Sequence, residues 1–384
     1  MWFAAGKAAC PVHLCPTVGV RMIAFQGRRA WRIENEQLRI TILECGGHIA
    51  EIVCKSAAEI NPLWTQDRPT IDSDQFDPDV HGPIYGIDAE ARLISGLMGH
   101  NLCFPSWGAP SASEHAAGMT FHGESNILRW EQLAGAADSL RLGVTTPNCS
   151  IRFERELQCA GNVVYVSETA TNLSAWDRPV GWCEHVSLGP PFVEARWTRF
   201  ESNLTRGFRT ADPSLAEFAW PQGRGTTPCV LTEFSTTQHA DLVNSFLIDP
   251  SSELGYFVAW HPRLSLLFGY VFLRREFPWM NVWEDHSISR QVRGMEFSNT
   301  PIDGTLRQFA EKPRIWGVPA FDWLDAKGIL RKSYAAFAIG VPADFKGVAE
   351  VAIAGAKLTI REKLTGGALV LDWAPYACHG MAGL

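Results

Sequence analysis

Short segments rich in β-branched and aromatic residues recur along the whole chain, and most are bounded by Gly, Pro, Asn or Asp. Such segments are typical of β-strands. Long amphipathic helical patterns with capping residues are scarce, and the chain lacks the alternating strand and helix patterns of a parallel sheet. The sequence therefore predicts an antiparallel all-β fold in which large sheets pack face to face. The strand-like segments are WRIENEQLRITIL (31–43), IRFEREL (151–157), VVYVSETATNLS (163–174), YFVAWH (256–261), LSLLFGYVFL (264–273), VAEVAIAG (348–355) and KLTIREKL (357–364).

Residues 321–340 are the best helix candidate, although Gly328 interrupts the pattern. Two stretches rich in Pro, Asp and Gly, at 61–90 and 203–228, are expected to be long loops. Loops of this length in a compact fold usually build a site or a lid. We therefore expect substrate specificity to lie in these loops.

The composition fits a folded globular protein, because 46% of the 384 residues are hydrophobic and 20% are charged. Length alone does not decide between one domain and two. We find no internal repeat and no low-complexity segment. The expected organisation is an N-terminal extension over residues 1–29, followed by a single β domain over residues 30–384.

The distribution of charged and apolar residues argues against two classes of partner. The formal net charge is −7, and Lys and Arg are scattered rather than clustered, so a nucleic-acid partner is not expected. A membrane partner is not expected either, because no apolar run reaches the 18 residues of a membrane span. The N-terminus lacks the continuous apolar core of a signal peptide, which predicts a cytoplasmic protein. The sequence leaves the oligomeric state open.

The ten cysteines have no repeated paired spacing, which favours reduced, mostly buried thiols. Cys10 and Cys15 are spaced as metal ligands can be, but a second Cys/His pair is not nearby. Loose N-terminal chain is the simpler interpretation of that segment.

Three stretches, 99–125, 181–191 and 277–301, concentrate His, Glu and Trp among glycines. His122 precedes a Gly, so it is either a turn residue or a catalytic group. His185 follows a strand in which Trp182 and Cys183 alternate between the two faces. Glu296 lies between Met295 and Phe297, so on a strand it points away from both. If those two face the core, Glu296 is expected to be solvated; if they flank a pocket, it can be a base.

The order of these stretches resembles that of the aldose 1-epimerases, also called galactose mutarotases. VVYVSETATNLSAWDRPVGWCEHVSLGPP (163–191) is similar to the segment in which two strands joined by an Asn-containing turn deliver a catalytic His. The upstream FPSWGAP and FHGE resemble the stretch in which a Phe-Pro turn precedes a His-Gly pair. MEFSNTP (295–301) stands where that family has a strand ending in a catalytic Glu. The resemblance extends from about residue 30 to the C-terminus.

This resemblance implies a galactose mutarotase-like β-supersandwich with a concave sugar-binding face. It implies that His185 is the general acid, Glu296 the general base and His122 a second His that positions the ring oxygen. The family commonly has an Asn-Arg pair where Ser106, Trp107 and Gly108 stand here. We therefore expect a sugar other than a plain free hexose, either modified or larger. The predicted ligand contacts are Trp107, Trp283, Glu124, His100 and Asn101.

The expected chemistry is the interconversion of sugar anomers. It needs the anomeric hydroxyl deprotonated and the ring oxygen protonated, which an ionised Glu and a protonated His can achieve. Glu124 is the loop carboxylate expected to keep His185 protonated. The reaction requires neither a metal nor an organic cofactor. A zinc site formed by His100, His122 and His185 is a less favoured alternative, since these residues lack helical spacing.

Two other functions remain open at this stage. One is sugar binding without catalysis on the same fold. The other is an oligosaccharide lyase or hydrolase, because a fold does not fix a reaction. Phosphate-binding Gly-rich loops and a GxSxG nucleophile motif are both missing from the sequence.

Overall fold

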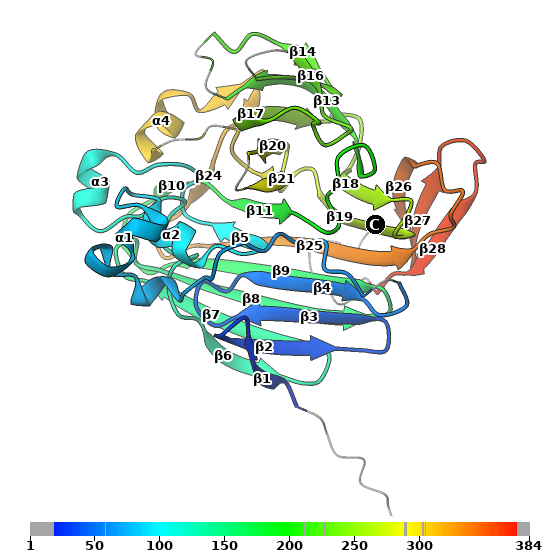
Figure 1. Ribbon diagram of the computed structural model, residues 1–384. Helices are drawn as coiled ribbons and strands as arrows, with labels where there is room; N and C mark the ends of the chain where they lie inside the picture. Colours follow the sequence, from blue (N-terminus) through cyan, green and yellow to red (C-terminus); the bar gives the residue numbers. More distant parts are fainter. Residues whose placement is uncertain are drawn as a thin grey trace, which may run out of the picture.

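The structure, a computed structural model, consists of two large antiparallel sheets with few short helices (Figure 1). It describes residues 19–57, 59–210, 212, 214–225, 228–287, 290–301, 303 and 305–374. The predicted all-β class is confirmed. One sheet has eleven strands, and the other has eight.

The eleven-stranded sheet contains the strands that carry the candidate site. Its order is β1 (Arg21–Phe25), β2 (Arg28–Glu34), β3 (Leu38–Leu43), β4 (Ile49–Cys54), β5 (His100–Cys103), β11 (Cys183–Leu188), β21 (Gln291–Ser298), β20 (Trp279–His286), β17 (His239–Ile248), β13 (Leu204–Arg209) and β14 (Phe218–Ala219). Strands distant in sequence are therefore neighbours at its centre.

The eight-stranded sheet covers one face of the first. Its order is β12 (Arg199–Ser202), β18 (Leu254–His261), β19 (Leu266–Leu273), β25 (Ile329–Gly340), β9 (Val163–Asn172), β8 (Ile151–Ala160), β7 (Ser139–Thr146) and β6 (Glu131–Gly135). Smaller sheets pair β10 (Arg178–Val180) with β24 (Asp322–Leu324), β15 (Gln222–Arg224) with β16 (Pro228–Val230), β22 (Arg314–Ile315) with β23 (Val318–Pro319), and β26 (Val348–Ala354) with β27 (Lys357–Glu362) and β28 (Ala368–Asp372).

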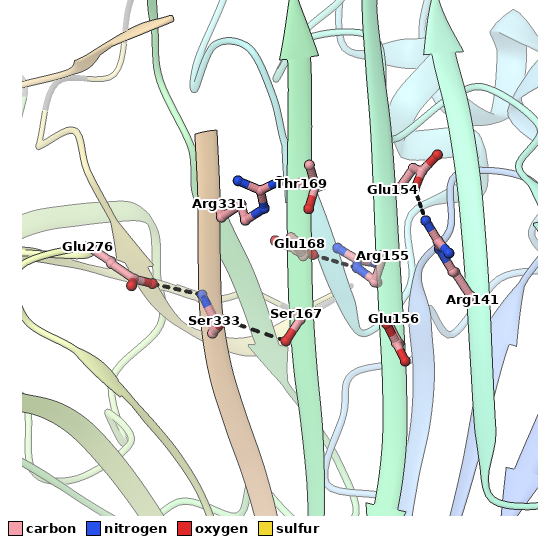
Figure 2. Close-up of a pocket in the computed structure, with 10 residues that line it drawn as sticks. All are labelled: Arg141, Glu154, Arg155, Glu156, Ser167, Glu168, Thr169, Glu276, Arg331 and Ser333. Atoms are coloured by element: carbon pink, nitrogen blue, oxygen red, sulfur yellow. Dashed lines mark hydrogen bonds and ion pairs between the residues drawn. The ribbon is translucent and has the colours of Figure 1, made fainter. Parts of the chain in front are cut away.

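The outer face of the eight-stranded sheet carries a polar hollow of about 540 Å³ (Figure 2). Strand β8 explains why this face is polar: Phe153 and Leu157 point inward and are buried, whereas Glu154 and Glu156 point outward. This alternation is the expected pattern for a sheet with one solvated face.

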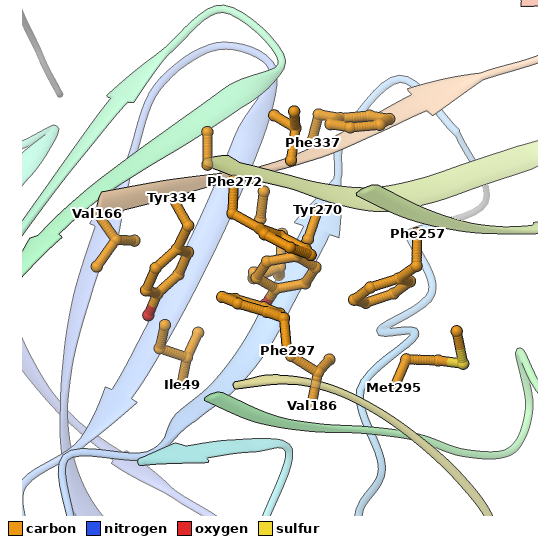
Figure 3. Close-up of a cluster of buried hydrophobic side chains, with 14 of the residues drawn as sticks. Ile49, Val166, Val186, Phe257, Tyr270, Phe272, Met295, Phe297, Tyr334 and Phe337 are labelled. Carbon is orange, nitrogen blue, oxygen red and sulfur yellow. The ribbon is translucent and has the colours of Figure 1, made fainter. Parts of the chain in front are cut away.

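Aromatic side chains between the two sheets form the centre of the core (Figure 3). Phe272 of β19 and Phe297 of β21 stack with their ring centroids 4.4 Å apart, so this contact joins the two sheets directly. Tyr334 of β25 packs edge-on against Phe297 at 5.1 Å. Burying aromatic rings of this size supplies much of the hydrophobic stabilisation of such a core.

Two expectations about the chain's organisation differ from the structure. The range 1–29, expected to be an extension, contains β1, which pairs with β2 and begins the sheet at Arg21. The strand is largely solvent-exposed on one side, but Ile23 and Phe25 pack against a small apolar cluster. Residues 321–340 form strands β24 and β25 rather than a helix. Cys10 and Cys15 lie outside the described residues.

The helices are short. Helices α1 (Pro78–Tyr85), α2 (Ala91–Gly96) and α3 (Ala112–Ala116) gather on one side of the molecule, with α4 (Leu306–Glu311) above them in the view of Figure 1. A 3₁₀ turn, η1 (Ser73–Gln75), precedes α1. Within the described ranges, none of the helices is long and apolar enough to cross a membrane.

Candidate active site

Four polar side chains form a row across the centre of the eleven-stranded sheet. Asn101 of β5 lies opposite His185 of β11, His185 lies opposite Glu296 of β21, and Glu296 lies opposite Asn281 of β20. Side chains directly opposite each other in an antiparallel pair share one face of the sheet. The strand register therefore brings His185 and Glu296 together, although 111 residues separate them in the sequence (296 − 185).

Glu296 points away from the core. Its neighbours Met295 and Phe297 are fully buried between the sheets (Figure 3), so strand alternation directs Glu296 to the opposite face. Glu296 is nevertheless only 1% exposed, because loops and α2 cover that face. Neither alternative drawn from the sequence described this arrangement, in which the core-facing neighbours coexist with a buried carboxyl that lines a cavity.

His185 and Glu296 are in direct contact, with His185 Nε2 3.1 Å from Glu296 Oε1. The other ring nitrogen, Nδ1, lies 3.2 Å from Ser187 Oγ. Burial lowers the pKa of His185 to about 4. Burial, together with repulsion from Asp303, raises the pKa of Glu296 well above its usual range. Both shifts disfavour the charged forms, so burial favours a neutral pair that shares one proton, held by Glu296 rather than by His185.

This protonation state differs from the expected ionised Glu and protonated His. The physical reason is that both groups are almost completely withdrawn from water, which disfavours each charge. A single proton transfer across 3.1 Å converts this pair into carboxylate and imidazolium. Polar groups of a bound ligand would favour that transfer, because they solvate the charges.

His122 lies beside the pair in a tight turn. Its ring centroid is 5.4 Å from that of His185. The backbone N–H of Gly108 donates to His122 Nδ1 at 2.8 Å, and the N–H of His122 donates to the carbonyl of Gly108 at 2.9 Å. Because Nδ1 accepts, a neutral His122 carries its proton on Nε2, which is then a donor. Burial lowers the pKa of His122 well below its usual range.

The backbone of this turn is specialised. His122 has φ 62° and Gly123 has φ 83°, so two consecutive residues occupy the left-handed region. A side chain at Gly123 would collide with the carbonyl of Phe104, which explains the need for glycine there. The FPSWG and FHGE segments are thus held against each other by the backbone, and this fixes the His122 ring over the site.

A cavity of about 220 Å³ lies over these three groups. This volume is below the roughly 300–1,000 Å³ typical of pockets for drug-sized ligands, so it suits a ligand of about one sugar ring. Trp107 and Trp283 both line it, as the sequence suggested. The cavity is lined by Glu90, Leu93, Ile94, Leu97, Trp107, Phe121, His122, His185, Val243, Trp283, Arg290, Glu296 and Asp303.

The two tryptophans differ in exposure. Trp107 is only 2% exposed and packs against Cys103 and Cys183, and its indole Nε1 has no hydrogen-bond partner of ordinary geometry. Its N–H still lies near enough to the Glu296 carboxyl to oppose the rise of that group's pKa. Trp283 is half-buried and meets the His185 ring edge-on at 5.8 Å.

The other three residues proposed as ligand contacts lie outside the cavity lining. His100 is completely buried on the core side, where its Nε2 lies 2.8 Å from Glu184 Oε2 and its Nδ1 lies 3.0 Å from the Tyr270 hydroxyl. Glu124 accepts hydrogen bonds from the backbone N–H groups of Asn148 and Cys149 at 3.2 and 2.9 Å.

Asn101 lies beside His185 in the polar row. It is fully buried, and its side-chain oxygen has no hydrogen-bond partner. The zinc alternative is not formed, because His100 lies on the opposite face of the sheet from His185. Among the residues that the structure describes, groups of three or more His, Cys, Asp or Glu side chains arranged to hold a metal ion do not occur.

The outer hollow of Figure 2 is larger than this cavity but lacks comparable chemistry. Its charged side chains include Arg141, which donates to Glu154 at 2.6 Å. Glu276 accepts from the backbone N–H of Ser333 at 2.7 Å. These groups already have partners, and the hollow has no histidine in its lining. We therefore place the candidate active site at the smaller cavity.

Sequence reasoning missed the outer wall of the cavity. Leu93, Ile94 and Leu97 reach it from helix α2 and the residue after it, and Asp303 and Arg290 reach it from loops. Asp303 lies two positions beyond the stretch 277–301 singled out from the sequence, and seven positions after Glu296 (303 − 296), so its proximity was a usable signal. Helix α2 is only six residues long, so the sequence contains no comparable signal that it would line the cavity.

Gly294 leaves room for the Glu296 carboxyl. A Cβ at this position would lie 2.6 Å from Glu296 Oε1 and 3.1 Å from the Cβ of Trp283. The carboxyl can move aside, so Gly294→Ala should fold, but the displacement should lower activity on the order of tenfold or more. Thermal unfolding would test the first expectation, and the rate of the reaction proposed below would test the second. Gly340→Ala is the matched control, because its Cβ would meet only Ser265 O, at 3.8 Å.

Comparison with models of known protein families gives no match, and comparison with curated proteins gives none either. Solved structures do match. A galactose mutarotase related enzyme from Lactobacillus acidophilus is 11% identical, with a TM-score of 0.58 over 81% of this chain and 98% of that one. A galactose mutarotase-like protein from Clostridium acetobutylicum is 12% identical, with a TM-score of 0.60 over 84% and 98%.

A Klebsiella pneumoniae protein, provisionally called an aldose 1-epimerase, is 12% identical, with a TM-score of 0.61 over 82% of this chain and 80% of that one. The structural similarity establishes the architecture. Because the sequence identities are so low, the activity has to be argued from the site. The chain therefore has the galactose mutarotase-like fold, with a sequence that has diverged far from those of the solved structures.

Proposed function

We propose that this protein interconverts the anomers of a monosaccharide by general acid and base catalysis. The observation that carries the proposal is the contact between His185 Nε2 and Glu296 Oε1. These two groups share one proton, and they line a cavity large enough for a single sugar ring. An acid and a base that exchange one proton are what ring opening and closure require.

The proposed reaction begins when a sugar lies across the pair. Transfer of the shared proton to His185 leaves Glu296 as a carboxylate, which removes the proton of the anomeric hydroxyl. His185 then protonates the ring oxygen, the ring opens, and rotation about the C1–C2 bond precedes closure on the other face. In this proposal His122 Nε2–H donates a hydrogen bond to the ring oxygen or a neighbouring hydroxyl. Closure reverses the proton transfers and restores the pair.

The direct test is the rate at which a freshly dissolved pure anomer equilibrates. Polarimetry or NMR would measure the rate with and without the protein for a panel of aldoses, and absorbance would detect an unsaturated product. Acceleration without a new double bond or a change of mass supports the proposal. Binding without acceleration would instead support a non-catalytic sugar-binding protein, and an unsaturated or cleaved product would support a lyase or hydrolase.

Trp283 offers a test of whether an aromatic ring of the cavity stacks on the sugar. Because it is half-buried and lines the cavity, Trp283→Ala should weaken sugar binding by about 1–3 kcal/mol, the scale of burying an aromatic-sized apolar contact. Calorimetry would measure the loss. Trp323→Ala is the matched control, since Trp323 is 57% exposed and lies outside the cavity. If the wild type and Trp283→Ala bound the sugar with equal affinity, Trp283 would not be a sugar contact.

A further inference from the structure

The lining of the candidate cavity is richer in acidic than in basic groups. Three of its side chains carry carboxyl groups, Glu90, Glu296 and Asp303, and Arg290 is the one Lys or Arg among the described residues that line it. Arg290 is already engaged, because its Nε lies 3.1 Å from Asp285 Oδ2. The cavity therefore offers a ligand more negative than positive charge.

Asp303 is the acidic group without a cationic partner. It accepts a hydrogen bond from the backbone of Ala109. Across the described part of the chain, Lys, Arg and His side chains form no ion pair with it. The side chain is exposed to the cavity mouth, yet the surrounding protein removes enough water to raise the pKa of Asp303 to about 6. At pH 7 it is mainly ionised.

Asp303 also acts on the proposed base. Its negative charge is the second cause, after burial, of the raised pKa of Glu296. A cation near both groups would offset the charge of Asp303 and favour ionisation of Glu296. A separate observation concerns the same place: the buried indole Nε1 of Trp107, which lines the cavity, has no hydrogen bond of ordinary geometry, so its N–H is available to a ligand oxygen.

As a refinement that rests on the proposed function, we propose that the substrate is an amino sugar, whose ammonium group lies between Asp303 and Glu296. An amine on C2 suits this position, because C2 is bonded to the anomeric carbon on which Glu296 would act. The charge of Asp303 disfavours sugars that carry a phosphate or a carboxylate, since these would place further negative charge beside it.

The ammonium would also prepare the catalytic pair. A positive charge beside Glu296 favours its ionised form, which drives the shared proton toward His185. The substrate would thus convert the neutral pair into the carboxylate and imidazolium that ring opening needs. A neutral sugar lacks this effect and is expected to react more slowly.

Calorimetry at pH 7 tests the inference with six sugars: D-glucosamine, D-galactosamine, D-glucose, D-galactose, N-acetyl-D-glucosamine and D-glucose 6-phosphate. We expect the amino sugars to bind about tenfold or more tighter than their parent hexoses, which corresponds to one buried charge interaction of about 1.4 kcal/mol. N-acetyl-D-glucosamine, which is larger but uncharged, should gain no such advantage. The phosphate should bind more weakly than glucose.

Variants separate the role of Asp303 from general effects of charge. In Asp303→Asn, the ratio of the Kd values of the parent and amino sugars should fall to within about twofold of one. Asp344→Asn is the matched control, because Asp344 is exposed and lies outside the cavity, and it should keep the wild-type ratio. Equal binding of glucosamine and glucose by the wild type, or tighter binding of the phosphate, would overturn the inference.

The two proposals can fail separately. If amino sugars bind preferentially but no anomer equilibrates faster, the proposed function is wrong and the ligand class stands. If glucose or galactose is equilibrated and the amino sugars have no advantage in binding, the function stands and the ligand class is wrong. If none of the six sugars binds, both are wrong.

Discussion

Glu296→Gln is expected to lower catalysed anomer exchange by a factor of about 100 or more while leaving the fold intact. The amide keeps the size of the side chain but cannot accept the proton of the anomeric hydroxyl. NMR exchange measurements on the sugar that the wild type equilibrates would give the rate, and calorimetry would confirm that binding persists.

The stability of this variant should also respond differently to pH. Burial raises the pKa of Glu296, so the wild-type fold loses stability as pH rises through that raised value. The Gln variant lacks this titration, and its unfolding temperature should therefore fall less between pH 6 and pH 9. Glu156→Gln is the matched control, because Glu156 lines the outer hollow of the other sheet. If Glu156→Gln abolished activity and Glu296→Gln did not, the site would lie at that hollow.

His185→Asn is expected to lower the rate by a similar factor and to change the pH profile. In the wild type, activity needs one proton on the pair, so kcat/KM should decline at low pH near the His185 pKa of about 4, where a second proton binds. It should also decline at high pH, where the shared proton is lost. The variant should lack the decline near pH 4.

Measuring kcat/KM from pH 3.5 to pH 9.5 tests this directly. His115→Asn serves as the control, because His115 is exposed on α3 and should keep the wild-type profile. A wild-type profile that stayed flat to pH 9 would assign the acid to another group.

The strand segments could be predicted because apolar and polar residues alternate along a strand that has one buried face, and because β-branched residues favour strands. The prediction failed where that signal disappears. Strand β25 lies between β9 and β19 and is buried on both faces through most of its length, and its run of Ala336, Phe337 and Ala338 shows no alternation. Ala is also the best helix former, so local preference favoured a helix until sheet pairing overrode it.

The order of His122, His185 and Glu296 was readable in the sequence because short motifs surround each residue. Their contact was not, since it depends on the register of three strands. The position of His100 shows the limit clearly: it is adjacent to Asn101 in sequence, but strand alternation places it in the core, bonded to Glu184. The positions of Asp303 and of the α2 residues that line the cavity depend on how loops fold over the sheet. Local sequence patterns do not indicate this.

The polar row across β5, β11, β21 and β20 has a consequence for how the protein folds. Every pairing between β5 and β11 and between β11 and β21 joins segments far apart in the chain, so the loops that must close before these contacts form are long. Domains dominated by such contacts fold slowly. Neither half of the chain contains both His185 and its partners on β5 and β21, so neither half alone can form the site. The site should appear only in the last steps of refolding, after most of the secondary structure has formed.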